Sequence, residues 1–379
     1  MTSIKGIDNC FGCGLCAITC SRKAIKIELN SNGFYSPIVN NKLCNDCSLC
    51  REVCAFLDDK VAINHGVEVK GYAAWSNDRT IRMICSSGGV SYELGRHLLS
   101  EGYKVCSVKY DSHQNKAVHY IATNEEELLS SVGSKYIQSY TVDGFRSINK
   151  KEKYLVTGTP CQIDSFRRYI RKFKVEENFI LMDFFCHAVP SMYAWNKYLK
   201  LIENNTGIVE SASWRNKDTG WHDSWAIRVK GKNGEYNSRF SQGDIFYKLF
   251  LGDFCCNPAC QKDCRFKYDK SSADIRIGDL WGKTYKTVDE GVSAVVSFTK
   301  KGDDIVNKLN CTIIPHPFEV VAEGQMKRNA GKHFLSPIVS IWLSSRRNYK
   351  IVIWVILFID WLWRFPKRAC NKIKRIITK

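Results

Sequence analysis

The sequence predicts a mixed α+β and α/β protein built from several parts. Three observations lead to this prediction. Residues 1–60 contain two runs of closely spaced cysteines, which indicates a small module of its own. Residues 153–170 and 178–202 each read as an apolar strand, a turn and a helix, which is the repeating unit of an α/β domain. Residues 351–365 are apolar and have basic neighbours on both sides, which predicts a C-terminal helix of amphipathic or apolar character.

The size and composition of the chain limit the kinds of protein that it can be. With 379 residues it has room for two or three domains and a substantial core. Eighteen cysteines, with no recognisable signal peptide, indicate reduced thiols that bind metal in a cytoplasmic protein. The net charge is +18, and half of it lies in residues 344–379, where ten Lys or Arg face one acid. This charge flanks an apolar run instead of forming an aromatic-rich patch on a folded domain, so we expect no nucleic-acid partner.

The two cysteine runs share the pattern C-x-x-C-x-x-C-x-x-x-C, which is the spacing of bacterial ferredoxins with two 4Fe–4S clusters. In such ferredoxins the fourth cysteine of each run binds the other cluster. The first cluster is therefore expected on Cys10, Cys13, Cys16 and Cys54, and the second on Cys44, Cys47, Cys50 and Cys20. A disulfide framework is disfavoured because the chain is large, and a zinc site because each run supplies a full quartet. Residues 1–60 are thus predicted to form a ferredoxin-type domain.

A turn rich in serine and glycine precedes a predicted helix in the next part of the chain. Ser86, Ser87, Gly88 and Gly89 come before leucines at helical spacing, and Gly102 closes the segment. A helix that begins in this way presents free backbone N–H groups, which can bind a phosphate or a flavin. The same residues also suit an ordinary helix cap and turn, so both interpretations stay open.

The remaining segments predict how the chain divides into domains. After a connector at 61–70, strands are expected at 71–76, 103–111, 117–123, 272–282 and 291–299. A β-rich part at 208–240 contains the hairpin turn Lys232-Asn233-Gly234. We therefore expect domains at 71–150 and 151–335, followed by a tail at 340–379.

Six stretches of the chain match a known family, in the order in which that family has them. They are CSSGG (85–89), GSKY (133–136), TGTPCQ (157–162), CHAVPS (186–191), WRNKDTGW (214–221) and CRFKYDKSSADIRIGDLWG (264–282). With them the chain resembles the beta-subunit family of coenzyme F(420) hydrogenases and dehydrogenases, in particular bacterial members with a fused N-terminal ferredoxin module. The resemblance implies an iron–sulfur flavoprotein with FAD, an oxidoreductase that links a one-electron carrier to a two-electron acceptor. Residues 71–335 would then hold an α/β flavin domain with a β-rich part.

The resemblance also implies site residues. A third 4Fe–4S cluster would be bound by Cys161, Cys186, Cys260 and Cys264, with Cys256 as the alternative to Cys264 because the last pair is one residue longer than in the family. FAD would contact Ser86, Ser87, Gly88 and Gly89, with Lys135 facing its phosphates or its reduced ring. The catalytic candidates are His187 and Lys135, since a histidine has the right pKa range for delivering a proton. His222 and Asp279 are further candidates for that role.

The tail predicts contact with a membrane. As a helix, residues 351–365 would span roughly 22 Å, short of the ~30 Å hydrocarbon core, and three tryptophans there prefer the lipid–water interface. The basic flanks favour an in-plane anchor on an anionic membrane surface, so we expect a peripheral protein on the inner face of the cytoplasmic membrane. A helix buried in the core or in an oligomer is the alternative.

These expectations combine into one leading function and two rivals. A ferredoxin or another low-potential carrier would supply electrons, which would pass through the clusters to FAD and leave as hydride to an organic acceptor, for example in surface-polysaccharide metabolism. The first rival is an electron-transfer subunit that feeds a partner enzyme and has no substrate of its own. The second is a family member that keeps its clusters and has lost the flavin.

Overall fold

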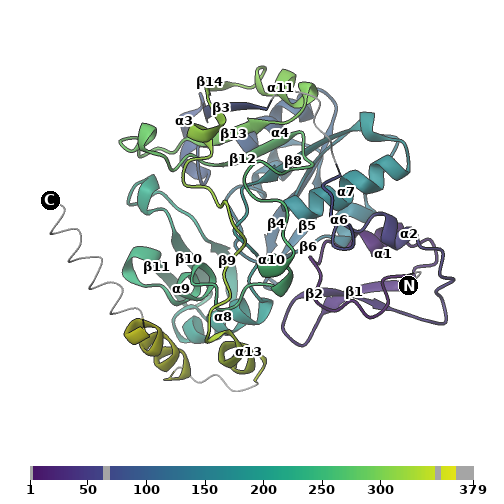
Figure 1. The fold of residues 1–379 in the computed structure, drawn as a ribbon. Coiled ribbons are helices and arrows are strands. Elements are labelled where there is room, and N and C mark those ends of the chain that lie inside the picture. Colours follow the sequence, from purple (N-terminus) through teal and green to yellow (C-terminus); the bar gives the residue numbers. More distant parts are fainter. Residues whose placement is uncertain (1–2, 63–68, 346–350, 364–379) are drawn as a thin grey trace.

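The computed structural model describes residues 3–62, 69–345 and 351–363, and a nine-stranded mixed sheet lies at its centre (Figure 1). The strand order is β14-β3-β13-β12-β8-β7-β4-β5-β6. The strands are β3 (Lys70–Ser76), β4 (Lys104–Asp111), β5 (Lys116–Ala122), β6 (Ser139–Tyr140), β7 (Tyr154–Thr157), β8 (Phe179–Phe184), β12 (Ile275–Asp279), β13 (Ser293–Ser297) and β14 (Cys311–His316). This sheet agrees with the predicted mixed class.

The middle of the sheet is parallel and is covered on both faces. The strands β4, β7, β8 and β12 run parallel to their neighbours within this group. Side chains alternate along β7, so that Leu155 packs on the face covered by α4 (Val90–Ser100). Val156 packs on the opposite face, which is covered by α7 (Pro160–Lys172). Because both faces are shielded, strands β7 and β8 read as nearly continuous apolar runs in the sequence.

The antiparallel edge strands join chain segments that the sequence assigned to separate domains. Strand β3 pairs with β13 on one side and with β14 on the other, and both pairings are antiparallel. Strand β3 belongs to the predicted domain 71–150, whereas β13 and β14 belong to 151–335. The boundary expected at residue 150 therefore does not divide this sheet.

The direction of the strands gathers several loops at one edge of the sheet. The carboxyl ends of β7, β8 and β12 meet there because these strands are parallel. Strand β13 is antiparallel to both β12 and β3, so β3 also ends at this edge. The segments that follow these ends contain Cys161, Cys186 and the Ser86–Gly89 turn, and β12 itself ends at Asp279. Ligands of open α/β sheets bind at an edge of this kind.

A smaller sheet forms the β-rich part of the chain. Its order is β11-β10-β9, and its strands are β9 (Val209–Ser213), β10 (Ala226–Gly231) and β11 (Gly234–Arg239). Strands β10 and β11 form the hairpin that Lys232-Asn233-Gly234 predicts, with Gly231 opposite Gly234. Apolar residues of β9 and β10 pack around Trp195 and Trp214, together with helices α8 (Met192–Thr206) and α9 (Ile245–Leu251).

The N-terminal module is a two-stranded sheet with two short helices. Its elements are α1 (Leu15–Thr19), β1 (Ile25–Leu29), β2 (Tyr35–Val39) and α2 (Leu49–Glu52). The strands are antiparallel, and the module packs against α6 (Val142–Arg146) and α7 at the side of the large sheet (Figure 1). The other short helices of the chain are α3 (Arg79–Ile84), α5 (Glu125–Leu129), α10 (Pro258–Lys262), α11 (Lys300–Val306) and α12 (Phe318–Val321).

Two helices, α13 (Ser336–Ser344) and 351–363, lie near the C-terminus, next to α8 (Figure 1). Ile353 and Ile356 are buried in one apolar cluster with residues of α13. The predicted connector and tail are only partly covered: residues 63–68, 346–350 and 364–379, which include every basic residue of the tail, lie outside the described residues. In the part that is described, no helix combines the length and the apolar character needed to cross a bilayer.

Candidate functional site

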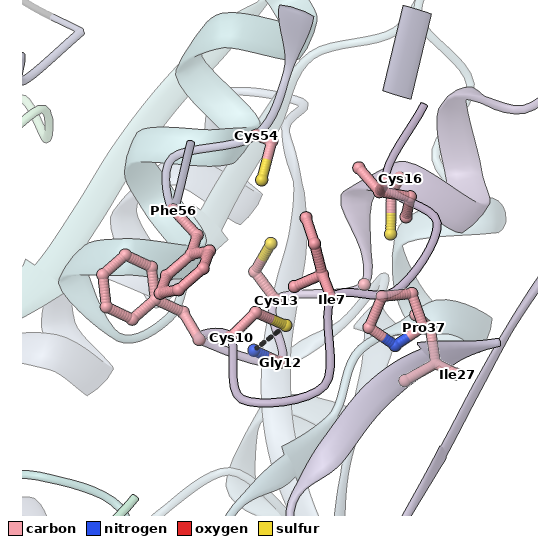
Figure 2. Close-up of a pocket in the computed structure, with 12 residues that line it drawn as sticks. Ile7, Cys10, Gly12, Cys13, Cys16, Ile27, Pro37, Cys54 and Phe56 are labelled. Carbon is pink, nitrogen blue, oxygen red and sulfur yellow. Dashed lines mark hydrogen bonds between the residues drawn. The ribbon is translucent and has the colours of Figure 1, made fainter. Parts of the chain in front are cut away.

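Four cysteines of the N-terminal module line one cavity (Figure 2). They are Cys10, Cys13, Cys16 and Cys54, the set that the spacing assigns to the first cluster. Apolar side chains complete the walls, among them Ile7, Phe11 and Phe56. The fourth cysteine of the second run therefore joins the first three cysteines of the first run, as in the ferredoxin pattern.

A second cavity is lined by the other four cysteines, Cys20, Cys44, Cys47 and Cys50. The two runs share one backbone shape, although only the first contains glycines. Gly12 and Gly14 have φ values of +67° and +75°, and the matching residues Asp46 and Ser48 have +54° and +65°. A left-handed conformation costs a non-glycine residue roughly 1–2 kcal/mol. The second run therefore adopts the same left-handed turn without glycine at either position.

The donor chemistry of both cavities fits iron–sulfur clusters. Each cavity offers four thiols, and Cys10 through Cys54 are all free of disulfides. Backbone N–H groups point at sulfur, with Gly12 N 3.3 Å from Cys10 Sγ and Ala24 N 3.4 Å from Cys20 Sγ. Burial, and then the neighbouring Cys13 thiol, raise the pKa of Cys10 to about 12. Thiols that hinder one another's ionisation in this way release their protons when a metal cation binds them.

A third set of four thiols, from Cys161, Cys186, Cys260 and Cys264, comes together at the carboxyl edge of the large sheet. Cys161 and Cys186 follow the adjacent parallel strands β7 and β8, and Cys260 and Cys264 come from α10 and the loop after it. Burial raises the pKa of Cys186 to about 11 and that of Cys260 to about 12, and Cys264 adds to both increases. Burial and the thiols of the other three also hold the pKa of Cys161 well above its usual range. Cys161 and Cys264 also lie against one apolar cluster, around Phe11 and Phe266.

Cys256, the alternative ligand, makes different contacts. Its Sγ lies 3.6 Å from the carbonyl oxygen of Phe250 and 3.7 Å from Asp253 Oδ1. The same carboxylate oxygen lies 2.8 Å from His187 Nε2. The geometry therefore favours Cys264 over Cys256 as a partner of Cys161, and it groups the predicted catalytic residue His187 with Asp253 and Cys256.

The first cavity and the third cysteine set are joined by direct contacts. Phe11, from the wall of the first cavity, packs in an apolar cluster against which Cys161 and Cys264 also lie. Cys13 Sγ lies 3.2 Å from Oγ of Ser165, a residue of α7. Since α7 also contains Cys161 in its first turn, one helix touches the first cavity and carries a member of the third set.

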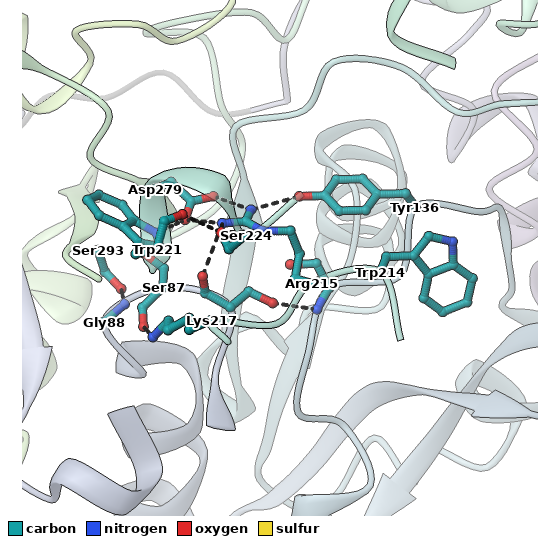
Figure 3. A network of polar contacts seen from close by, with 12 residues as sticks. Ser87, Gly88, Tyr136, Trp214, Arg215, Lys217, Trp221, Ser224, Asp279 and Ser293 are labelled. Carbon is teal, nitrogen blue, oxygen red and sulfur yellow. Dashed lines mark hydrogen bonds and ion pairs between the residues drawn. The ribbon is translucent and has the colours of Figure 1, made fainter. Parts of the chain in front are cut away.

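The Ser86–Gly89 turn packs tightly against the large sheet and leads into α4 (Figure 3). Gly88 N donates to Ser293 Oγ at 3.0 Å. A Cβ at Gly88 would lie 2.4 Å from the carbonyl oxygen of Ala74, so only glycine fits there. Gly89 then takes a φ of +88°, which turns the chain into the helix. The first N–H groups of a helix have no acceptor within it, so this turn can bind an anion.

Cationic side chains converge on the same turn (Figure 3). Arg215 Nη2 donates to the Ser86 carbonyl at 3.2 Å, and Lys217 Nζ donates to the Ser87 carbonyl at 2.6 Å. The residue before Lys135 donates its N–H to Ser86 Oγ at 2.9 Å. Three basic side chains thus lie on or beside one turn, each bonded to backbone carbonyl groups there or nearby.

Arg215 connects the turn to the end of β12. Its buried guanidinium pairs with Asp279 at 2.9 Å and donates to the Tyr136 hydroxyl at 3.1 Å. The ring centroids of Trp225 and Trp281 lie 5.2 Å and 5.3 Å from its Cζ atom, within cation–π range. Arg215 thus pairs with a residue, Asp279, that the sequence predicts as a candidate for proton transfer.

Two of these three basic side chains have a pKa below the usual value for lysine. Burial lowers the pKa of Lys135 to about 7 and that of Lys217 to about 8, and the Cys85 thiol opposes both changes. Lys135 Nζ donates to the carbonyl groups of Ser131 and Val132, at 2.7 Å and 3.1 Å. At neutral pH Lys135 can therefore give or take a proton at Nζ, beside the turn.

Comparison with known families decides what kind of protein this is. Residues 71–143 match the N-terminal part, and residues 151–313 the C-terminal part, of the family described as coenzyme F420 hydrogenase/dehydrogenase, beta subunit. The chain belongs to this family. The assignment made from the six sequence stretches is thereby confirmed, and the chain shares the oxidoreductase class of its relatives.

Three curated relatives are similar over much of the chain. The coenzyme F420 hydrogenase subunit beta of Methanococcus voltae is 25% identical over 249 residues, which cover 62% of this chain and 79% of that protein. The coenzyme F420-dependent sulfite reductase of Methanocaldococcus jannaschii is 28% identical over 324 residues, which cover 79% of this chain and 45% of that protein. A subunit of the F(420)H(2) dehydrogenase of Methanosarcina mazei is 25% identical, over 46% of this chain and 52% of that protein. This beta-subunit homologue thus spans about half the length of two of these relatives.

A similar chain is found among solved structures, in the F420-reducing NiFe hydrogenase complex of Methanosarcina barkeri. The TM-score is 0.47 at 18% identity, and the match covers 76% of this chain and 92% of that chain.

The structure gathers most of the predicted site residues and separates others. The two quartets of the N-terminal module each line one cavity, Cys161 and Cys264 lie against one apolar cluster, and the Ser86–Gly89 turn lies with Lys135 at the same edge of the sheet. His187 instead contacts Asp253 and Phe250, neither of which belongs to that turn. Arg215 and Lys217 were not predicted as site residues from the sequence. The signal was present in the stretch WRNKDTGW, where two cations sit among buried aromatic residues.

Proposed function

We propose that this beta-subunit homologue is an iron–sulfur flavoprotein oxidoreductase that takes electrons from ferredoxin or another low-potential carrier and passes them as hydride to an organic acceptor. The observation that supports the proposal is that eight cysteines line two cavities as sets of four, while four more follow β7 and β8 or lie in and after α10. Bound 4Fe–4S clusters would supply single electrons, and bound FAD would supply hydride chemistry, which takes two electrons and one proton.

The chain's own residues divide this work. The ligands would be Cys10, Cys13, Cys16 and Cys54 for the first cluster, Cys20, Cys44, Cys47 and Cys50 for the second, and Cys161, Cys186, Cys260 and Cys264 for the third. The Ser86–Gly89 turn and the start of α4 would bind FAD, because the first N–H groups of a helix lie there beside three basic side chains. Lys135 would hold or release a proton at Nζ, since its pKa is about 7. His187, held by Asp253, is the second proton-transfer candidate.

A second candidate function is electron transfer to a partner enzyme, with no substrate of the chain's own. Two curated relatives carry the word subunit in their names, which favours this interpretation. The two candidates differ in one observable. If the chain is an enzyme, the isolated chain reduces an acceptor when it is given a reduced carrier. If it is an electron-transfer component, the acceptor is reduced only when the partner enzyme is also present.

The first experiment is anaerobic purification followed by iron and flavin analysis. We expect about twelve irons per chain, from three 4Fe–4S clusters, together with extractable FAD. About eight irons without flavin would overturn the third cluster and the flavoprotein assignment together, and would leave the degenerate family member as the correct interpretation. Iron near zero would overturn the proposal as a whole.

We further propose that the C-terminal helices bind an anionic membrane surface, which would place the acceptor near the membrane, as in surface-polysaccharide metabolism. The outward face of these helices is almost entirely apolar. Its exposed residues are Ile338, Ile341, Ile351, Trp354, Val355, Phe358, Ile359, Trp361, Leu362 and Trp363. An exposed apolar patch of this extent marks an interaction site, and the basic residues of 344–379 favour anionic lipid as its partner.

Charge placed on this apolar face should abolish lipid binding. In the double variant Trp354→Glu and Phe358→Glu, we expect binding to anionic liposomes to fall at least about tenfold, because each residue loses roughly 1.5–3 kcal/mol of burial in the lipid interface. The measurement is co-sedimentation with liposomes at several ionic strengths. The matched control is Ile208→Glu with Phe240→Glu, which places the same charges on exposed apolar residues elsewhere, 67% and 45% exposed. Equal binding by both double variants would contradict the membrane proposal.

A further inference from the structure

The two cavities of the N-terminal module differ in their access to solvent. Among the cysteines of the second cavity, Cys47 is exposed and Cys44 is partly exposed. In the first cavity no cysteine is exposed and Cys16 is buried. The first cavity is also the one that contacts α7 and the third cysteine set, through Ser165 and Phe11. The second cavity is therefore the outer one and the first cavity is the inner one.

Two turns beside the second cavity lie next to each other at one end of the β1–β2 sheet. Ile25, the first residue of β1, pairs with Val39, the last residue of β2. Beyond this pair, Asn40 N donates to the Ala24 carbonyl at 2.8 Å. The turn that follows Cys20 and the turn that precedes Cys44 are thus held side by side.

These turns carry a basic surface with apolar residues in it. Arg22, Lys23 and Lys42 are exposed, and none of them forms an ion pair with any residue that the structure describes. The nearby carboxylate of Asp46 is already paired with Lys5, at 3.0 Å. Exposed apolar side chains lie on the same strand and turn, with Ile38 at 52% and Leu43 at 50%. We call these five residues, Arg22, Lys23, Ile38, Lys42 and Leu43, the basic rim.

We propose that the basic rim is the docking surface for a small acidic electron-carrier protein, and that electrons move from the second cavity to the first and then to the third cysteine set. This inference rests on the proposed function, because it assumes that clusters occupy the cavities. Unpaired cations around an exposed redox centre attract an acidic partner over a distance comparable to the Debye length, about 8–10 Å at moderate salt. Ile38 and Leu43 would form the apolar centre of this interface, from which water is excluded. The exposed Cys47 then marks the point of closest approach.

The test is charge reversal at the rim, in the triple variant Arg22→Glu, Lys23→Glu and Lys42→Glu. Its matched control is Lys200→Glu, Lys232→Glu and Lys308→Glu, which changes the net charge equally on exposed residues outside the module. The probe is a reduced acidic two-cluster ferredoxin, and stopped-flow absorbance follows reduction of the holoprotein. We expect the second-order rate constant of the rim variant to fall about 10- to 100-fold at low salt, and the difference to shrink as salt is added. The control variant should stay within about threefold of the unchanged protein.

Iron content separates the two ways in which the inference can fail. Equal rates for the rim variant and the control variant, with full iron in both, would overturn the docking surface and leave the proposed function intact. The same holds for a rate that does not depend on salt in the unchanged protein. An unchanged protein that is purified without iron in its N-terminal module would overturn the proposed function, and this inference with it.

Discussion

Replacing Cys264 with alanine is expected to remove about four irons per chain, whereas replacing Cys256 with alanine is expected to leave the iron content unchanged. The reason lies in the contacts of the two thiols. Cys264 lies with Cys161 in one apolar cluster and raises the pKa of Cys186 and Cys260. Cys256 instead contacts Asp253 and the carbonyl oxygen of Phe250. Loss of the third cluster should also stop electron flow to the acceptor, so activity with ferredoxin should fall below detection.

Iron and acid-labile sulfide analysis of the two variants measures this effect, and circular dichroism verifies that both variants fold. Cys256→Ala serves as the matched control, because Cys256 is a buried cysteine only eight positions from Cys264 in the sequence. The reverse result, with iron lost from Cys256→Ala and kept in Cys264→Ala, would show that Cys256 is the ligand and Cys264 is not.

The largest loss of stability is expected for Arg276→Met. Arg276 on β12 and Asp183 on β8 are both fully buried, and two nitrogen–oxygen contacts of 2.7 Å join them. Removing the guanidinium leaves the Asp183 carboxylate buried, with the Ser271 hydroxyl, at 2.7 Å, as its remaining donor among the described side chains. Breaking a buried pair in this way costs about 3–5 kcal/mol. Since β8 leads directly to Cys186, we also expect partial loss of the third cluster.

Thermal unfolding at one fixed scan rate measures the effect, and the apparent Tm of Arg276→Met should fall by about 4–6 °C. Arg79→Met is the matched control. Arg79 pairs with Glu290 at 2.7 Å but its side chain is 79% exposed, so this pair should contribute about 0–1 kcal/mol. Equal shifts of Tm in the two variants would contradict the assignment of Arg276 and Asp183 as a buried structural pair.

Local patterns account for what the sequence predicted well. The first three cysteines of each run are two residues apart, so a short turn brings their thiols together, whereas the fourth cysteine of each run lies with the other set. The apolar strands β7 and β8 and the proline that starts α7 are local signals as well. The hairpin at Lys232-Asn233-Gly234 belongs to the same class, because a two-residue turn is encoded by adjacent residues.

Long-range topology accounts for what the sequence did not predict. Strand β3 is inserted between β13 and β14, which come from the other end of the chain, and no local pattern indicates this pairing. The pairing of Arg215 with Asp279 depends on the same topology, because the two residues are 64 positions apart. Lys135 was expected to face a ligand, and its Nζ is bonded to two backbone carbonyls of its own loop, which no local pattern indicates.

Helix α7 connects the N-terminal module to the third cysteine set. It carries Cys161 in its first turn and touches Cys13 of the N-terminal module through Ser165, and Asn257 holds the module from another side by donating to the Cys10 carbonyl at 3.0 Å. Carrier domains that ferry electrons on a swinging arm must detach and reattach in every cycle. Here the module is held from two sides, so the spacing between the inner cavity and the third cysteine set is a fixed length built into one helix. In the electron path proposed above, the module would therefore act as a fixed relay, and only the external carrier would have to diffuse.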